Sequence, residues 1–168
     1  EYDIPDYDAE IITGTKHMAD LFEETTKICG KPKKVSNWLM GETMRLLKEN
    51  SMEAEEICFA PEHLAVLIEL VDAGTINGSV AKEVFEEMFK SDVDPEKYVE
   101  EKGLKVVNDE GALRETIEKV IAENPQSVED YHNGKKKAMG FLVGQTMKAM
   151  KGKANPAMVN AILQELLA

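Results

Sequence analysis

The stretch "KKKAMGFLVGQTMKAMKGKANP", Lys135–Pro156, contains six lysines and no carboxylate, although the chain of 168 residues carries a formal net charge of −12. Its apolar residues recur with helical spacing, and Asn155 followed by Pro156 is typical of the start of a further helix. Glycines at positions 140 and 144 interrupt the first helix. The stretch therefore predicts helical structure that combines positive charge with bare backbone.

A projection of this stretch at about 100° per residue separates it into two faces. The face predicted to point into a core carries Ala138, Met139, Leu142, Val143, Thr146, Ala149 and Met150. The opposite face, predicted to be exposed, carries Lys137, Gly140, Phe141, Gly144, Lys148 and Lys151. A glycine inside a helix costs about 1 kcal/mol relative to alanine, so two glycines on one face require an explanation.

Three explanations for the two glycines remain open from the residues alone. Gly140 and Gly144, four residues apart, could let another helix pack closely. They could instead let a sugar–phosphate backbone approach while the lysines of the same face supply charge, which gives affinity and shape recognition rather than base reading. Folded RNA, whose A-form grooves are recognised by shape and 2′-hydroxyls, would be a suitable ligand. The third explanation is that the glycines have no role.

The charge of the chain is unevenly distributed. Residues 125–168 carry six lysines against Glu129, Asp130 and Glu165, a net charge of +3, whereas the remaining 124 residues carry −15. An acidic body repels a polyanion, so any contact with nucleic acid should concentrate at the basic end of the chain.

Apolar residues recur at helical spacing along most of the chain, and no segment alternates as a strand would. The sequence therefore predicts an all-α fold of two small helical domains, a helical bundle in residues 1–104 and a second domain in residues 105–168. Prolines at first positions, Asn or Asp caps and terminal glycines set the expected helix limits. Helices are expected from residue 8 and over residues 16–30, 31–50, 61–74, 77–91, 94–103, 109–124, 125–134, 135–151 and 155–168.

Two helices of the first domain have apolar faces that we expect to be buried. The face of residues 16–30 consists of Met18, Leu21, Phe22, Thr25 and Ile28. The face of residues 31–50 consists of Val35, Trp38, Leu39, Met44, Leu46 and Leu47.

The sequence lacks the patterns of common catalytic and metal sites. It has no phosphate-binding glycine loop, its three histidines lie far apart, and its two cysteines have no C-x-x-C spacing. We therefore predict no catalytic residue and no metal ligand. The apolar runs are too short to span a bilayer, and two lone cysteines favour a reducing, cytoplasmic setting. Because the chain begins with Glu1 rather than Met, we expect a piece of a longer polypeptide.

Five segments, taken together, resemble one known family. "GKKKAMGFLVGQTMKAMKGKANP" is similar to the C-terminal signature of the B subunits (GatB) of glutamine-dependent aspartyl/glutamyl-tRNA amidotransferases, a tail domain shared with YqeY-like proteins. Four further segments begin before this signature and stand in the same order as in the family: "SNWLMGE" at 36–42, "GTINGSVAKEVFEEM" at 74–88, "EKGLKVVND" at 101–109 and "ENPQSVEDYHNGK" at 123–135. In addition, "YDIPDYDAEIIT" at 2–13 is similar to the join between the catalytic cradle and the helical domain of that subunit.

The resemblance implies a fold and a function. The second domain would be a YqeY-like tail of three to four helices that holds tRNA(Gln) or tRNA(Asn). The full-length protein would be a carbon–nitrogen ligase that converts Glu-tRNA(Gln) or Asp-tRNA(Asn) with ATP and ammonia from glutamine, together with A and C subunits. ATP and Mg would bind only in the cradle, so this chain is expected to hold no cofactor and to be inactive alone.

The resemblance also implies which residues contact RNA. They are Lys135, Lys136, Lys137, Gly140, Gly144, Lys148, Lys151, Gly152 and Lys153. Asn37 and Trp38 match the family as well, and we interpret them as buried packing with a satisfied polar partner rather than as RNA-stacking residues. The alternative function is a structural helix-docking module of a free-standing YqeY-like protein.

Overall fold

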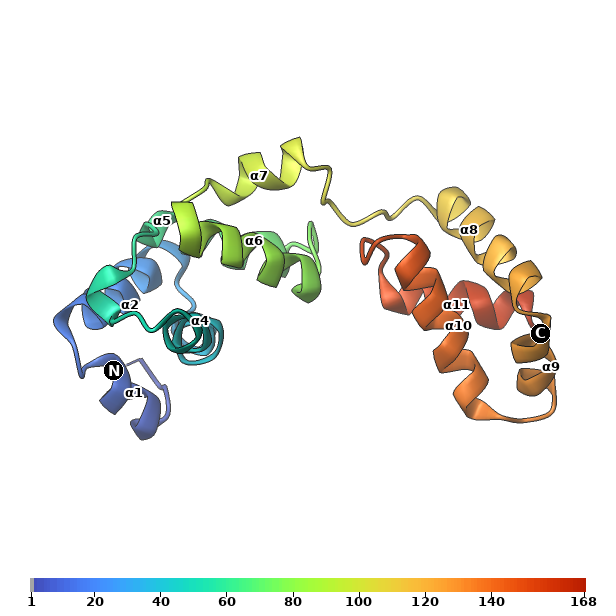
Figure 1. The fold of residues 1–168 in the computed structure, drawn as a ribbon, viewed down its shortest axis with the longest axis horizontal. Coiled ribbons are helices and arrows are strands. Elements are labelled where there is room, and N and C mark those ends of the chain that lie inside the picture. Colours follow the sequence, from blue (N-terminus) through green and yellow to red (C-terminus); the bar gives the residue numbers. More distant parts are fainter. Residues whose placement is uncertain (1) are drawn as a thin grey trace. The chain divides into compact units, whose positions relative to one another are not determined.

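The computed structural model describes residues 2–168, which form an all-α protein, as predicted (Figure 1). The chain divides into two compact units, one ending at Leu104 and the other comprising Lys105–Ala168. Within residues 2–168, the one β feature is an isolated parallel bridge between Val107 and Ala154. No helix of this described part is both long enough and apolar enough to cross a membrane.

The first unit is a bundle built around a continuous apolar core. Its largest fully buried side chains include Leu64, Leu67, Phe85 and Met88, and the rings of Phe59 and Trp38 lie 5.3 and 5.1 Å from that of Phe85. Its helices are α1 (Asp6–Ile12), α2 (Lys16–Cys29), α3 (Pro32–Trp38), α4 (Met44–Asn50), α5 (Pro61–Asp72), α6 (Gly78–Ser91) and α7 (Pro95–Glu101). A short 3₁₀ turn, Ala54–Glu56, lies between α4 and α5.

A π-helical turn, Leu39–Thr43, joins α3 to α4 where one continuous α-helix was predicted. The buried hydroxyl of Thr43 donates a hydrogen bond of 3.1 Å to the carbonyl of Trp38 at this turn. A π turn inserts an extra residue and shifts the faces of the helix beyond it. The prediction that Met44 is buried is wrong: it is 37% exposed, and at about 100° per residue it projects opposite the buried Val35 even in a regular helix.

The buried face of α2 also differs from the prediction at one position. Met18, Leu21, Phe22 and Thr25 are buried as expected, but Ile28 is 49% exposed. At about 100° per residue, Ile28 projects at the edge of this buried arc, whose centre lies near Cys29. Cys29 accordingly packs against the core.

The second unit consists of four helices around its own core. They are α8 (Glu110–Glu123), α9 (Pro125–His132), α10 (Lys136–Ala149) and α11 (Pro156–Leu166), and α10 packs against the other three (Figure 1). The core includes Leu113, Ile117, Leu142, Val159 and Leu163, none of which is exposed to solvent.

The loop between α10 and α11 is attached to the start of this unit. The amide of Val107 donates a hydrogen bond of 2.7 Å to the carbonyl of Lys153, next to the fully buried Ala154. At the other end of the unit, the ring of His132 lies 3.1 Å from the carbonyl of Leu167. The first connection joins two backbone atoms and the second joins a side chain to a backbone carbonyl; they attach the loop and the C-terminal end to the rest of the unit.

The position of Leu142 predicts its contribution to stability. Replacing Leu142 by alanine should destabilise the second unit by about 2–5 kcal/mol, because a fully buried leucine leaves a cavity. The matched control is Phe141→Ala, since the neighbouring Phe141 is 46% exposed. Hydrogen exchange of the amides in residues 105–168 measures the stability of the second unit in both variants. If Leu142→Ala lost no more stability than Phe141→Ala, this packing would be contradicted.

Candidate nucleic-acid interface

Helix α10 presents an exposed face that we call the basic face: Lys137, Gly140, Phe141, Gly144, Lys148 and Lys151. All six residues are exposed, as the projection predicts. The opposite side is anchored by Ala138, Leu142 and Thr146, which are buried, and the hydroxyl of Thr146 donates a 2.9 Å bond to the carbonyl of Leu142. Because that seam is held in the core, the basic face must point to solvent.

One residue on the predicted inner face of α10 is not buried. Ala149 is exposed, so that part of the prediction is wrong. It projects in the direction of Leu142, but it is the last residue of the helix, and the packing that covers Leu142 does not extend to it. Met139, Val143 and Met150 are partly buried and pack against the core of the unit.

Most lysines of this region have no compensating partner. Lys135 pairs with Asp130 at 2.8 Å, but none of the other five forms an ion pair within the described residues 2–168. The unpaired five are Lys136, Lys137, Lys148, Lys151 and Lys153. Lys136, Lys137, Lys148 and Lys151 are exposed, whereas Lys153 is partly buried. Most of this positive charge is therefore uncompensated and accessible to a ligand.

Several charges elsewhere in the chain are held in networks. Arg45 donates to Glu86, Glu42 and Glu49 at 2.7–2.8 Å, and these hydrogen bonds raise the pKa of the Arg45 guanidinium. Asp72 accepts from both Lys31 and Lys34, which lowers the pKa of its carboxyl group. On α8, the hydrogen bond from Lys119 lowers the pKa of Glu115. Lys16, Lys48, Lys102 and Lys105 likewise form no ion pair within residues 2–168, so the region around α10 is distinguished by having five unpaired lysines within 18 consecutive residues.

The start of α10 is unfavourable for an isolated helix. Lys135 occupies the N-cap without a capping hydrogen bond from its side chain, and the first turn contains no acidic residue. By contrast, Asp109 and Asn155 cap α8 and α11 through their side chains. The amide of Ala138 donates to the carbonyl of Lys135 at 2.9 Å, whereas those of Lys136 and Lys137 have no acceptor within residues 2–168. They lie at the positive end of the helix dipole, so lysines there are repelled and an anion is attracted.

The end of α10 is a Schellman motif with an unusual residue in its left-handed position. The amide of Gly152 donates to Met147 at 2.8 Å and that of Lys151 to Lys148 at 3.0 Å, which places Lys151 at a φ of 53°. Glycine usually occupies that position because it has no Cβ. Helices α5, α7 and α9 end with the same pair of bonds and have glycine there (Gly74, Gly103 and Gly134), whereas α4 has Ser51.

The two glycines of the basic face have open space around them. A Cβ added to Gly140 or to Gly144 would meet no other atom within 4 Å, so no neighbouring helix of this structure requires their small size. Close packing of another helix inside the chain therefore does not explain them. The two explanations that remain are an external partner and the absence of any role.

The predicted RNA-contacting residues thus lie in three places. Lys135, Lys136 and Lys137 begin α10; Gly140, Gly144 and Lys148 follow along its exposed side; Lys151, Gly152 and Lys153 form the loop after it. Gly152 and Lys153 are partly buried, and their backbones take part in the Schellman motif and in the bond with Val107. Sequence reasoning missed the ion pair of Lys135 and the left-handed conformation of Lys151.

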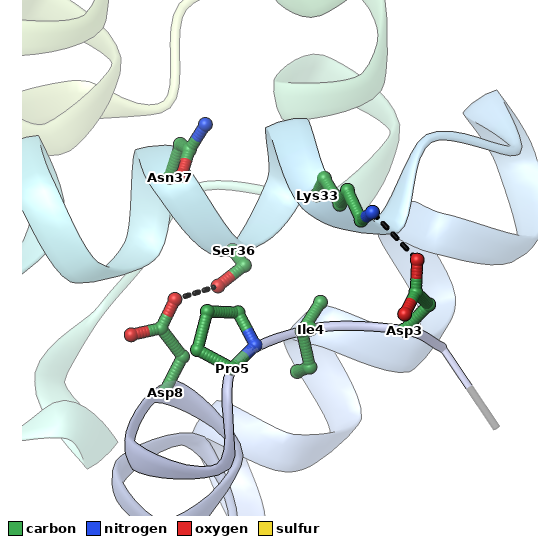
Figure 2. Close-up of a pocket in the computed structure, with 7 residues that line it drawn as sticks. All are labelled: Asp3, Ile4, Pro5, Asp8, Lys33, Ser36 and Asn37. Atoms are coloured by element: carbon green, nitrogen blue, oxygen red, sulfur yellow. Dashed lines mark hydrogen bonds and ion pairs between the residues drawn. The ribbon is translucent and has the colours of Figure 1, made fainter.

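The first unit offers a second candidate, a cavity of about 410 Å³ between the N-terminal segment and α3. Figure 2 shows its polar groups paired with one another: Lys33 with Asp3 at 2.6 Å, and the hydroxyl of Ser36 with Asp8 at 2.9 Å. The hydrogen bond and charge of Lys33 lower the pKa of the Asp3 carboxyl. These groups satisfy each other, so the cavity presents no reactive group.

Asn37 lines the same cavity and points away from Ser36 and Asp8 (Figure 2). The interpretation of Asn37 and Trp38 as buried packing holds for Trp38, which packs against the core, and is wrong for the exposed Asn37. Within residues 2–168, no group of three or more His, Cys, Asp and Glu side chains is placed to hold a metal ion.

The open space at Gly140 and Gly144 predicts that larger residues stabilise the free protein. Replacing both by alanine should raise the stability of the second unit by about 1 kcal/mol for each glycine, because alanine loses less backbone entropy in a helix. Urea unfolding of the second unit measures the change. Ala161→Gly on the exposed side of α11 is the control and should lower the stability by about 1 kcal/mol. If the two alanines at positions 140 and 144 destabilised the unit instead, their face would have to be covered.

The left-handed conformation of Lys151 predicts a second stabilising change. Lys151→Gly should stabilise the second unit by about 0.5–1 kcal/mol, because glycine avoids the steric cost of the left-handed region but loses more chain entropy on folding. The reverse change at an equivalent position, Gly134→Lys, is the control and should destabilise. If Lys151→Gly were destabilising instead, the lysine side chain would have to contribute to folding.

Comparisons with known proteins agree with the resemblance noted from the sequence. The family model described as the GatB domain (GatB_Yqey) matches residues 20–167. The B subunit of an aspartyl/glutamyl-tRNA(Asn/Gln) amidotransferase from Agathobacter rectalis is 72% identical over 167 residues, covering 99% of this chain and 35% of the relative. Proteins of the same name from Lachnoclostridium phytofermentans and a Thermoanaerobacter species are 64% and 59% identical with the same coverage.

The match extends along nearly the whole chain but along a limited part of each relative. The chain spans 35% of the length of these curated relatives, although the alignments cover 99% of the chain itself. The family match includes most of the first unit and all four helices of the second, with the complete basic face. The chain belongs to the GatB domain family.

Proposed function

We propose that this chain is the tRNA-binding portion of an amidotransferase B subunit and that the basic face of α10 contacts the tRNA backbone. The observation that carries the proposal is that α10 keeps several features that disfavour its own folding. Two exposed glycines, an uncapped lysine-rich start and a left-handed lysine all lie on or beside one face. Such local conflicts are expected where a surface serves a ligand, because selection then acts on binding as well as on stability.

Each of these features suits a polyanion. The glycines remove side chains where a sugar–phosphate backbone would approach, and the lysines neutralise phosphates. Lys137 and Lys148 are eleven positions apart, which at 1.5 Å per residue corresponds to about 16 Å along the helix axis. The free amides of Lys136 and Lys137 add a place where a phosphate oxygen can accept hydrogen bonds.

The mechanism that we propose for this portion is positioning. Contacts with phosphates fix the orientation of an RNA without reading its sequence. Holding the body of Glu-tRNA(Gln) or Asp-tRNA(Asn) in one orientation would bring its aminoacyl end to a remote active site. The reaction of that end with the catalytic groups would then be effectively unimolecular rather than bimolecular. The negative charge of residues 1–124 would disfavour RNA bound in other places.

The chemical steps are assigned to the remainder of the full-length protein. In this proposal, ATP, Mg and glutamine-derived ammonia act in a cradle domain and in partner A and C subunits, and the assembly works in the cytoplasm. This chain would contribute no catalytic residue. Its role would be to raise the effective concentration of the correct tRNA at that centre.

The alternative function is a docking module for a protein helix. Gly140 and Gly144 have room for such a helix, as they have for RNA. An apolar helix docked there would have to cover Lys137 and Lys148 without offering them counter-charges, which is costly. A polyanion supplies those charges, and for this reason we favour RNA.

The proposal predicts a salt-dependent affinity for tRNA that depends on the basic face. Changing Lys137, Lys148 and Lys151 to Glu should weaken binding of a tRNA(Gln) transcript at low salt by about 100-fold or more. It should also reduce the slope of log K against log salt by about 2–3, since each phosphate contact contributes about 0.7–0.9. Filter binding or fluorescence anisotropy at several salt concentrations measures both quantities.

The control places the same charge change on the first unit. Lys16, Lys48 and Lys97 are exposed, and changing all three to Glu gives the same net charge without altering α10. This control should retain more than half of the wild-type salt slope. Equal effects of the two triple variants would mean that net charge alone governs binding, and unchanged binding by the α10 variant would refute the proposed interface.

A further inference from the structure

Phe141 is an exposed aromatic side chain in the middle of the basic face. It is 46% exposed, and the other large apolar side chains exposed to a similar degree in the described chain, Tyr7, Ile28 and Met44, all lie in the first unit. Phe141 takes part in none of the aromatic contacts formed within residues 2–168. Phe141 is not among the residues that pack against the core of this unit, whereas its neighbour Leu142 is fully buried there.

The surroundings of Phe141 leave its ring accessible to a flat ligand. Gly144 lies three residues further along α10 and therefore on the same surface, and it adds no side chain beside the ring. A Cβ at Gly140 or Gly144 would meet nothing within 4 Å, so the backbone on this side is open as well. Lys137, four residues before Phe141, brings an unpaired ammonium group to the same place.

The combination of an open aromatic ring with unpaired lysines points to one class of ligand. A nucleotide offers an anion and a flat π-system together, and stacking of a base on an aromatic side chain is a recurrent contact of RNA-binding proteins. In a continuous duplex the faces of the bases are hidden within the stack. A base that could reach Phe141 must therefore come from a loop, a bulge or an end.

We infer that Phe141 stacks on an unpaired nucleobase of the RNA whose backbone is held by the lysines of the basic face. This inference rests on the proposed function and extends it, because it assigns the selection of RNA structure to one side chain. Lysines alone would bind any duplex of similar charge. Phe141 adds affinity only for an RNA that presents an unstacked base beside a helical segment.

The test compares two substitutions at Phe141 on two RNA probes. Phe141→Leu keeps an apolar side chain but removes the π face, whereas Phe141→Trp keeps it. The probes are an unmodified tRNA(Gln) transcript and a blunt RNA duplex with the same number of phosphates. Phe141→Leu should weaken tRNA binding by about 5- to 150-fold, the range found for loss of one stacked base. It should change duplex binding by less than about twofold, and Phe141→Trp should bind tRNA as well as the wild type.

Chemical probing of the RNA provides a second readout. One loop base of the transcript should become protected on binding wild-type protein and Phe141→Trp, and should stay reactive with Phe141→Leu. Thermal unfolding should be the same for all three proteins, because the side chain lies outside the core. A substantial shift in unfolding would mean that Phe141 packs internally, and it would overturn the inference.

The triple lysine variant separates this inference from the proposed function. If the lysine changes abolish tRNA binding while Phe141→Leu leaves it unaltered, the basic face binds RNA without stacking and the inference is wrong. Equal losses on tRNA and duplex for Phe141→Leu would also contradict it. If neither set of changes affects RNA binding, the proposed function fails too, and the exposed ring belongs to a protein interface.

Discussion

Burial of Ala138, Leu142 and Thr146 in the second unit determines which side of α10 is exposed to solvent. These residues are four apart, so they form one seam along the helix, and the other three helices of the unit pack around it. A helix fixed by one seam has no rotational freedom, and its opposite side is exposed by geometry. The lysines and glycines of the basic face are consequently displayed whether or not they help the protein to fold.

That separation explains how α10 can tolerate residues that oppose helix formation. In proteins most helical stability comes from packing of the apolar side rather than from intrinsic propensity. Leu142 and its neighbours supply this packing, which leaves a margin for two glycines, an uncapped start and a left-handed lysine. Other helices of the chain show some of these features singly: α4 and α6 end at Ser51 and Asp92 with positive φ, and α1, α3, α5 and α9 begin without a side-chain cap. In α10 these features occur together, on the helix whose outer side has a ligand to bind in our proposal.

Much of this structure could be predicted from the sequence because the helix limits are set by short-range chemistry. Proline at a first position, side-chain caps at Asn77 and Asp109, and terminal glycines at Gly74 and Gly103 act within a few residues. The exposed side of α10 could be predicted for the same reason, since a regular helix keeps its period of about 3.6 residues over several turns.

The features that were missed depend on contacts that a periodic pattern does not contain. The π turn before Met44 involves a bond from the buried hydroxyl of Thr43 to the carbonyl of Trp38. Ile28 and Ala149 lie where the surrounding packing ends, which no property of the residue itself reveals. The conformation of Lys151 arises from the hydrogen bonds that close α10, and the contact of the basic face with RNA stays a prediction.

The backbone bond between Val107 and Lys153 has a consequence for the evolution of this unit. Because main-chain atoms make it, side-chain substitutions leave it in place, with proline at position 107 as the exception, since proline has no amide hydrogen. The loop after α10 can therefore change its charge or size over many generations without losing its attachment. A lineage could adapt the surface to a different ligand by ordinary mutational drift, while the scaffold underneath is inherited unchanged.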